Sequence, residues 1–312
     1  MKNQKPRIEF YKQRSFSEKM NATFEFTREN WKPLLKYSFY MIMPICLIQT
    51  FATNSFFNTY LSLLERSVGG SSYINSVYDI FVNYGIMMFC IIIGSAIMSG
   101  MIYAMMQTYA TRENRLIDVT IADFKDAMTR NVWKYIRMFL ALLFVYIFVI
   151  VIIGALTYIS TVTLAITIPL FIALIILLIP LMMVIPVYIF ERDINFTEAV
   201  KKAWKLGTTT LWGMLGLMII LYFISSVIQT VTMLPWYLTL VIGMAFSLAS
   251  EYMIAQSIVY KFAVYLLGLI QSFGMYVSMI IGIIGLAFQY FHAREKVEGI
   301  TIESNITNFD EL

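Results

Sequence analysis

The side chains that most often carry catalysis are scarce in this chain of 312 residues. It holds one histidine, His292, and two cysteines, Cys46 and Cys90, both inside long apolar runs. Acid–base and nucleophilic chemistry need a base held beside a proton donor or nucleophile, and a zinc site needs about four His, Cys or carboxylate ligands. No glycine-rich phosphate loop of the Walker or dinucleotide type is present. We therefore expect no enzyme, no metal site and no cofactor.

Two short charged clusters are the remaining candidates for a functional site. The clusters are Glu191, Arg192 and Asp193, and Arg294, Glu295 and Lys296. Each cluster directly follows an apolar run of membrane length. Opposite charges at neighbouring helix ends can form ion pairs. We expect the clusters to close one face of a helix bundle or to dock a partner; the alternative is that both are solvated helix ends.

Composition indicates the elements that must position these side chains. The chain is 59% hydrophobic and 13% charged, whereas soluble domains carry about 25% charged residues. Several apolar runs reach the roughly 20 residues that a helix needs to cross a bilayer. The runs are continuous rather than alternating, which excludes a membrane β-barrel. The sequence therefore predicts an all-α, polytopic membrane helix bundle with the lipid bilayer as its first partner.

Apolar runs and charges together predict six spans. These lie at about residues 34–57, 84–108, 135–157, 164–190, 212–234 and 264–291. The predicted transmembrane domain, 34–291, lies between a polar N-terminal segment, 1–33, and a polar tail, 292–312.

The stretch 235–263 is the hardest to assign. A seventh span there would place Glu251 and Lys261 in or near the apolar core, and a charge at the bilayer centre costs about 2.5–3.5 kcal/mol. We therefore expect a fifth helix kinked at Pro235, followed by a short helical or re-entrant piece on the outer face. Trp236 and Tyr237 would lie at headgroup depth there, as aromatic side chains often do.

The distribution of cationic residues predicts the orientation. Segments 1–36, 109–137, 191–211 and 292–312 hold every one of the 23 Lys and Arg residues except Arg66 and Lys261. Loops rich in Lys and Arg stay on the cytoplasmic side of a membrane. Both chain ends are therefore expected in the cytoplasm.

A short unit occurs three times ahead of the spans. Its copies are Ser15-Phe16-Ser17-Glu18 with Trp31, Asp123-Phe124-Lys125-Asp126 with Trp133, and Asn195-Phe196-Thr197-Glu198 with Trp212. A Ser, Asp or Asn three residues before a carboxylate is a helix N-terminus signal. The spacing from Phe to Trp is 15, 9 and 16 residues, so the second copy has lost about two turns. We expect three amphipathic helices in the membrane plane, with basic side chains toward anionic lipid headgroups.

Small residues recur within two predicted spans. They are Ser95, Ser99 and Gly100 in the second span, and Gly282 and Gly285 in the last. Small side chains let helix backbones approach closely in lipid. These residues are therefore expected to form helix-packing faces.

Two segments resemble a known family. The run Pro186-Val187-Tyr188-Ile189-Phe190-Glu191, followed by the segment 196–206 that contains Glu198-Ala199 and Trp204, resembles bacterial membrane proteins related to the glycerophosphodiester phosphodiesterase membrane domain. The tail 287–299 resembles the C-terminal end of an uncharacterised branch of these proteins. The resemblance implies a helical membrane domain in a bacterial cytoplasmic membrane. The catalytic domain of the enzyme members is expected to be absent, and phosphodiesterase activity is not implied.

These features predict a non-enzymatic integral membrane protein that serves as a subunit or scaffold of a membrane-protein assembly. Other membrane proteins are the expected partners, and no feature points to a nucleic acid. The alternative is a lipid or amphiphile carrier built on the repeat, with a cavity lined by Gln107, Gln271 and hydroxyl side chains. Repeated helical units build such cavities in many transporters.

Overall fold

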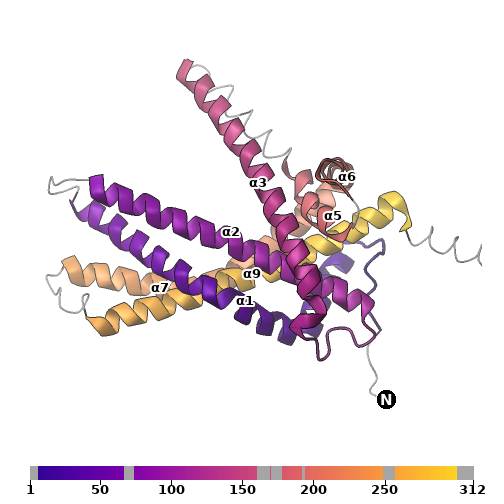
Figure 1. Ribbon diagram of the computed structural model, residues 1–312, viewed down its shortest axis with the longest axis horizontal. Coiled ribbons are helices and arrows are strands. Elements are labelled where there is room, and N and C mark those ends of the chain that lie inside the picture. The colour runs from indigo at the N-terminus through magenta and orange to yellow at the C-terminus, as the bar shows by residue number, and fades with distance from the viewer. Residues whose placement is uncertain are drawn as a thin grey trace, which may run out of the picture. The chain divides into compact units, whose positions relative to one another are not determined.

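The computed structural model describes residues 6–66, 74–159, 178–191, 194–248 and 257–300, along with residue 169. Within these residues the chain is helical and contains no strand (Figure 1). The elements are α1 (Phe16–Arg66), α2 (Ile74–Thr111), α3 (Ile121–Ile159), the 3₁₀ helix η2 (Pro180–Met183), α5 (Val184–Phe190), α6 (Phe196–Thr209), α7 (Leu211–Leu248) and α9 (Ile258–Glu298). The predicted all-α helix bundle is confirmed.

Five helices of the described part are long and apolar enough to cross a membrane. The segments are Phe16–Tyr60, Val77–Thr111, Ile121–Ile152, Leu211–Phe246 and Ile258–Glu298. By length and composition the chain is therefore a multi-pass membrane protein. The predicted fourth span, about 164–190, lies largely outside the described residues. Its described end is the short apolar segment Pro180–Phe190, so the count of six spans stays a prediction.

Two of the three repeated units open at the predicted residue. The Ser15 amide donates to Glu18 Oε2 at 2.6 Å, and the Glu18 amide donates to Ser15 Oγ at 3.3 Å. The Asn195 amide likewise donates to Glu198 Oε2 at 3.3 Å. These reciprocal bonds satisfy backbone donors that a first helical turn leaves open.

The second unit opens three residues earlier than predicted. Its cap is Thr120, whose amide donates to Asp123 Oδ2 at 2.7 Å and whose hydroxyl donates to the same oxygen at 2.9 Å. Asp123 is thus the third residue of α3 and not its cap, because Thr120 offers both an amide and a hydroxyl to its carboxylate. Counted from Ile121, twelve residues separate the helix start from Trp133. The second unit is therefore about one turn shorter than the others, not two.

The first and third units share a break that sequence inspection missed. Asn30 has non-helical backbone angles inside α1 (φ −113°, ψ 16°), and Thr210 separates α6 from α7 with similar angles (φ −120°, ψ 20°). Each break lies fifteen residues after its cap, Ser15 or Asn195. Asn30 Nδ2 donates to the Phe26 carbonyl at 2.9 Å, and Thr210 Oγ1 donates to the Leu206 carbonyl at 2.8 Å. Such side-chain bonds to the backbone compete with helix continuation.

The amphipathic segments are therefore not all separate helices. In the second unit α3 runs without a break from Ile121 into the apolar segment. In the first and third units a break separates the amphipathic segment from the span, at Asn30 inside α1 and at Thr210 after α6. The predicted amphipathic segments thus exist as helical turns, and the one in the second unit is continuous with its span.

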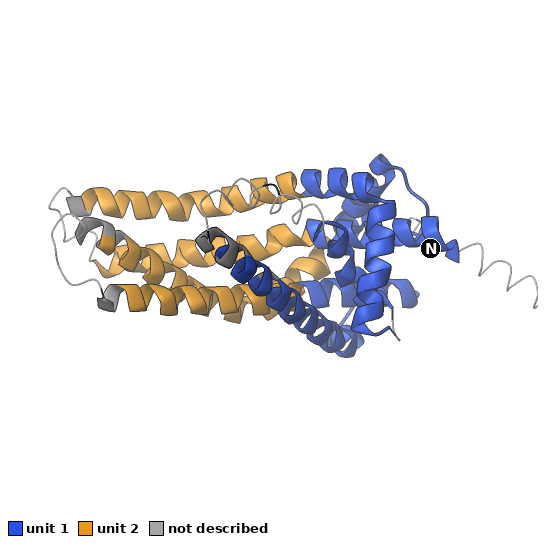
Figure 2. Cartoon of the chain, turned by 90° about the horizontal axis from the view of Figure 1, so that it is seen from above, with its two compact units in different colours: residues 1–30, 99–221, 281–312 blue, residues 31–98, 222–280 orange. Residues whose placement is uncertain are grey.

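The helices form two compact units (Figure 2). Unit 1 comprises residues 1–30, 99–221 and 281–312, and unit 2 comprises residues 31–98 and 222–280. The chain passes from one unit to the other inside α1, α2, α7 and α9. Unit 2 is thus a bundle of four helical segments.

The core of unit 2 contains Trp236. Its side chain is 3% exposed and packs with Leu240 and Val264. Its indole Nε1 donates to Asn54 Oδ1 at 2.9 Å. Because Asn54 supplies an acceptor, the indole N–H is satisfied inside the protein; the predicted headgroup depth of Trp236 stays a prediction.

The predicted fifth helix extends through Pro235, and residues 249–256, where the short outer piece is expected, lie outside the described residues. Helix α7 continues through Pro235 to Leu248, and α9 begins at Ile258 with Lys261 exposed in its first turn. Proline is tolerated inside membrane helices because neighbouring groups can satisfy the freed carbonyl. Glu251 lies outside the described residues.

A second polar contact joins the helices of unit 2. The Tyr276 hydroxyl contacts Gln49 Oε1 at 2.5 Å and the Cys90 carbonyl at 2.9 Å. Gly94 lies against the Tyr276 ring, where a Cβ atom would collide with it. Cys46 and Cys90 are both buried free thiols, in keeping with a packing role.

Candidate functional site

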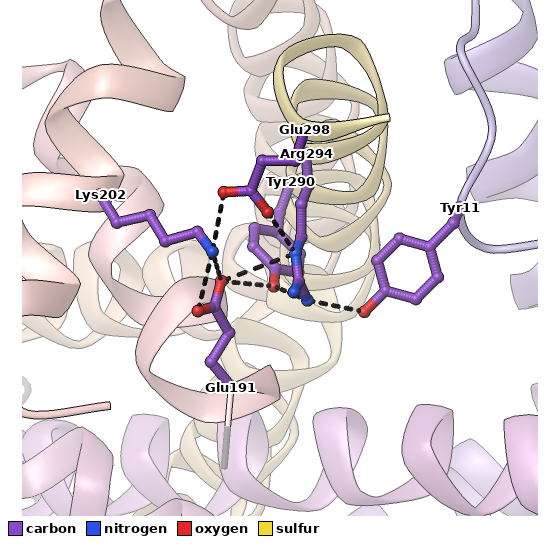
Figure 3. A network of polar contacts seen from close by, with 6 residues as sticks. All are labelled: Tyr11, Glu191, Lys202, Tyr290, Arg294 and Glu298. Atoms are coloured by element: carbon purple, nitrogen blue, oxygen red, sulfur yellow. Dashed lines mark hydrogen bonds and ion pairs between the residues drawn. The ribbon is translucent and has the colours of Figure 1, made fainter. Parts of the chain in front are cut away.

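Four side chains of alternating charge form a closed ring in unit 1 (Figure 3). Lys202 Nζ lies 2.9 Å from Glu191 Oε1 and 2.8 Å from Glu298 Oε1. Arg294 Nε lies 2.9 Å from Glu298 Oε2 and 3.8 Å from Glu191 Oε1. We call Glu191, Lys202, Arg294 and Glu298 the charge ring. Each cation contacts both carboxylates. Because the ring contains two cations and two carboxylates, it has no formal net charge.

Local structure brings the ring members together from three elements. Glu191 is the C-terminal cap of α5 and has extended backbone angles (φ −92°, ψ 122°). Lys202 lies in α6, while Arg294 and Glu298 lie one turn apart in α9, a spacing that places them on the same helix face. The four side chains are 13–29% exposed. Each pair is therefore partly shielded from water, and the network ties three helices together.

Two tyrosines extend the ring toward the N-terminal segment (Figure 3). The Tyr290 hydroxyl donates to Glu191 Oε1 at 3.2 Å and accepts from Arg294 Nη1 at 3.2 Å. Arg294 Nη1 also donates to the Tyr11 hydroxyl at 3.3 Å. Burial raises the pKa of Tyr11, so this phenol stays neutral as it accepts the bond. The ring is thus linked to a residue that precedes the first helix.

Residues 6–14 are held against unit 1 by backbone and aromatic contacts. The Ile8 amide donates to the Tyr109 hydroxyl at 3.3 Å. The Arg14 amide donates to His292 Nδ1 at 3.0 Å. The Phe10 ring stacks on Phe291, with ring centroids 4.9 Å apart. The lone histidine of the chain therefore acts as a hydrogen-bond acceptor that fixes this segment.

A buried relay of polar side chains lies between α1, α9 and the break at Thr210. Lys19 is 3% exposed, and its Nζ donates to Gln289 Oε1 at 2.6 Å. Gln289 Nε2 in turn donates to Thr210 Oγ1 at 3.0 Å. Among the described residues no carboxylate forms an ion pair with Lys19. A buried ammonium with an uncharged acceptor is costly, so this relay marks a specific feature of unit 1.

The structure brings together one predicted residue from each charged cluster. Glu191 and Arg294 meet in the charge ring. Glu295 is buried but is not a member of the ring, and Lys296 is exposed. Arg192 and Asp193 lie outside the described residues.

Sequence reasoning missed four members of the site: Lys202, Glu298, Tyr290 and Tyr11. The spacing of Arg294 and Glu298 is a helical i, i+4 pair and was a usable signal. The remaining three are placed by contacts between distant elements, for which the sequence carries no local signal.

Four of the five predicted packing residues are buried, and two of them, Gly100 and Gly285, lie at close helix contacts. A Cβ atom on Gly100 would lie 2.5 Å from Val132 Cγ2, so α2 and α3 approach closely there. Gly285 lies against Leu221 of α7. Ser99 is buried, and the Ser95 hydroxyl bonds to the Ile91 carbonyl within its own helix.

Gly282 differs from the other packing residues. A Cβ atom added to it would meet no atom within 4 Å. Its lack of a side chain is therefore not required by a neighbour in the described structure.

Comparisons with known protein families, with curated proteins and with solved structures find no match for this chain. The resemblance to the glycerophosphodiester phosphodiesterase membrane domain therefore stays a prediction. Within the described residues, no group of three or more His, Cys, Asp or Glu side chains is arranged to hold a metal ion.

Proposed function

We propose that the chain is a non-enzymatic, multi-pass membrane protein that acts as a subunit or scaffold of a membrane-protein assembly. The observation that carries the proposal is the exposure of the apolar span of α3. Among the described residues, 6% of its most apolar stretch is buried, against 44% for the corresponding stretches of α2 and α9. Its exposed side chains include Leu140, Phe144, Val145, Ile147, Phe148 and Val151. A span so little covered by the described part of the chain offers an apolar surface to helices of another protein.

The pairing of interior polar groups supports this proposal over a carrier. A carrier cavity was expected to be lined by Gln107 and Gln271. Instead, Gln107 Nε2 donates to the Ile189 carbonyl at 3.4 Å, and Gln107 Oε1 accepts from Asn131 Nδ2 at 3.3 Å. Gln271 Oε1 accepts from the Ser272 hydroxyl at 3.3 Å. These amide groups are hydrogen-bonded to other groups of the chain, so they stabilise the bundle rather than bind a ligand.

The proposed location is a bacterial cytoplasmic membrane with both chain ends inside. The support is the asymmetry of Lys and Arg along the sequence and the resemblance described above. The charge ring and the N-terminal segment would then form a rigid cytoplasmic face, suited to docking a partner protein.

Site-specific cross-linking tests the proposal. A photoreactive residue is introduced at Phe144, which is 73% exposed, and as a matched control at Ile42, which is fully buried. We expect Phe144 to cross-link one protein at a fixed stoichiometry in intact membranes, and Ile42 to cross-link none. Native mass spectrometry should then find the chain in a complex of larger mass than the monomer. Lipid adducts alone at Phe144, with a monomeric mass and one retained lipid species, would instead favour the carrier.

A further inference from the structure

The first turns of α3 border a basic groove. Arg130, Trp133, Lys134 and Arg137 of α3, with Tyr188 of α5, enclose about 440 Å³. The four α3 residues follow the i, i+3, i+4, i+7 pattern and therefore lie on one helix face. Three cations and two aromatic rings thus surround one concave site in unit 1.

The central lysine of the groove is already engaged. Lys134 Nζ donates to the Glu191 carbonyl at 3.0 Å and to the Tyr188 carbonyl, and it lies 4.8 Å from the centre of the Tyr188 ring. These bonds satisfy carbonyls that the C-terminal end of α5 leaves open. Lys134 therefore stabilises the floor of the groove, and its ammonium is engaged by these carbonyls rather than by a ligand.

The two arginines are exposed and have no partner within the described part of the chain. Neither Arg130 nor Arg137 forms an ion pair or a side-chain hydrogen bond there, and Asp126, one turn before Arg130, forms no ion pair with it. They lie about 10 Å apart along the axis, at 1.5 Å per residue. Their long side chains can converge on one anion between them.

The groove lies where α3 changes from polar to apolar. Arg137 is the last charged residue before an uncharged stretch that runs to Ile152. Trp133, at the groove, is 58% exposed. Tryptophan and arginine at the end of a membrane span are typical of headgroup depth. A ligand of the groove would therefore have its polar end at the membrane surface and its apolar end along α3.

We propose that this groove binds the phosphate group of an anionic phospholipid. Arginine forks present several N–H donors to phosphate oxygens in a planar arrangement. Basic clusters next to a span attract anionic lipids. The acyl chains would lie on the exposed apolar face that begins at Leu140. This inference goes beyond the proposed function, because a lipid site is independent of a protein partner.

Lipid co-purification tests the site in the full chain. The protein is reconstituted in equal amounts of phosphatidylcholine and phosphatidylglycerol, extracted in mild detergent, and its retained lipids are counted by mass spectrometry. We expect the wild type to enrich phosphatidylglycerol and the double variant Arg130→Gln, Arg137→Gln to lose about ten-fold of that enrichment. The matched control Lys12→Gln, Lys296→Gln removes the same charge from exposed positions outside the groove and outside the three repeated units, and should stay within about two-fold of the wild type.

Two further arms make the result decisive. The variant Arg130→Lys, Arg137→Lys keeps the charge but removes the forks, so it should lose enrichment with an unchanged Tm; it replaces the glutamine variant if that one does not fold. Inorganic phosphate added during extraction should not displace the lipid. The proposal is overturned if the control loses as much lipid as the arginine variants, if the lysine variant retains full enrichment, or if free phosphate releases the lipid.

Discussion

The ammonium of Lys19 lies 2.6 Å from the amide oxygen of Gln289, although 270 positions separate the two residues in the sequence. The contact fixes the start of α1 against the end of α9. Because the ammonium has an uncharged partner, its burial costs more free energy than the single hydrogen bond returns.

Removing only one partner of this contact should destabilise unit 1. Gln289→Leu leaves the buried Lys19 ammonium without its acceptor, which costs about 3–5 kcal/mol in the free energy of unfolding. The double variant Lys19→Met, Gln289→Leu removes both polar groups and should recover most of that loss. Denaturant titration in detergent measures both values. A double variant less stable than Gln289→Leu would contradict this account.

The charge ring should show energetic coupling between its members. We expect a double-mutant cycle of Lys202→Gln and Glu298→Gln to give a coupling free energy of about 0.5–3 kcal/mol. The partly exposed side chains are screened by ions, so the coupling should fall in high salt. The same cycle with Lys202→Gln and Glu25→Gln, an exposed carboxylate on α1, is the control and should give a value near zero. Equal coupling in both cycles would show that the ring has no special role.

The contact between α6 and η2 should not tolerate a single added methyl group. A Cβ atom on Gly207 would lie 2.6 Å from the Pro180 carbonyl oxygen, a backbone atom that cannot turn away. Gly207→Ala should therefore cost about 1–3 kcal/mol of stability through overpacking.

Gly282→Ala is the matched control for this change. No atom lies within 4 Å of its added Cβ, and alanine is the better helix former by about 1 kcal/mol. Its Tm should be equal to or above that of the wild type, whereas the Tm of Gly207→Ala should fall. A fall of the same size in both variants would refute the packing argument.

The N-terminal segment should detach when Phe10 loses its ring. Phe10 contacts the rings of Phe291, Tyr109, Phe288 and Phe26, with centroid distances of 4.9–6.1 Å. Phe10→Ala removes these contacts, and we expect trypsin to cleave after Lys12 about ten-fold faster, because local opening governs the rate of cleavage. Phe24→Ala, at an exposed position of α1, should leave the rate unchanged. An unchanged rate for Phe10→Ala would mean that the backbone bonds alone hold the segment.

Reporter fusions should find both chain ends on the cytoplasmic side. The basic residues outside the predicted spans are concentrated in alternate segments, which favours an even number of crossings. A reporter that is active only in the cytoplasm, fused after Leu312, should be active, and one fused after Arg66 should not. Activity at Arg66 with silence at Leu312 would reverse the proposed orientation.

The sequence predicted the parts of this structure that depend on neighbouring residues. Composition indicated the helical membrane fold, and the spacing of Ser15 with Glu18 and of Asn195 with Glu198 identified two helix starts. Charge at neighbouring helix ends singled out Glu191 and Arg294 as members of two candidate clusters, though not as a pair. The cap bonds form within one helical turn. The charged clusters follow membrane spans, and the predicted topology places the ends of these spans on the same side of the membrane.

The remaining features depend on contacts between distant segments. Lys19 looks like any other residue of a charged segment until Gln289 covers it. In the sequence Trp236 resembles a tryptophan at a membrane interface. Its burial is favourable because Asn54, which is distant in the sequence, accepts a hydrogen bond from its indole. The cap of α3 was misplaced for a different reason, because Thr120 competed with Asp123 for the same role and offered two donors.

The alternation of sign around the charge ring constrains how the chain can diverge. A substitution that removes one charged side chain leaves three charges with a net charge of one. Substitutions that remove one cation together with the neighbouring carboxylate, or that exchange the two, keep the ring neutral. Descendants of a common ancestor should therefore vary at Glu191, Lys202, Arg294 and Glu298 in concert. Such covariation would identify distant homologues even where overall sequence similarity has been erased.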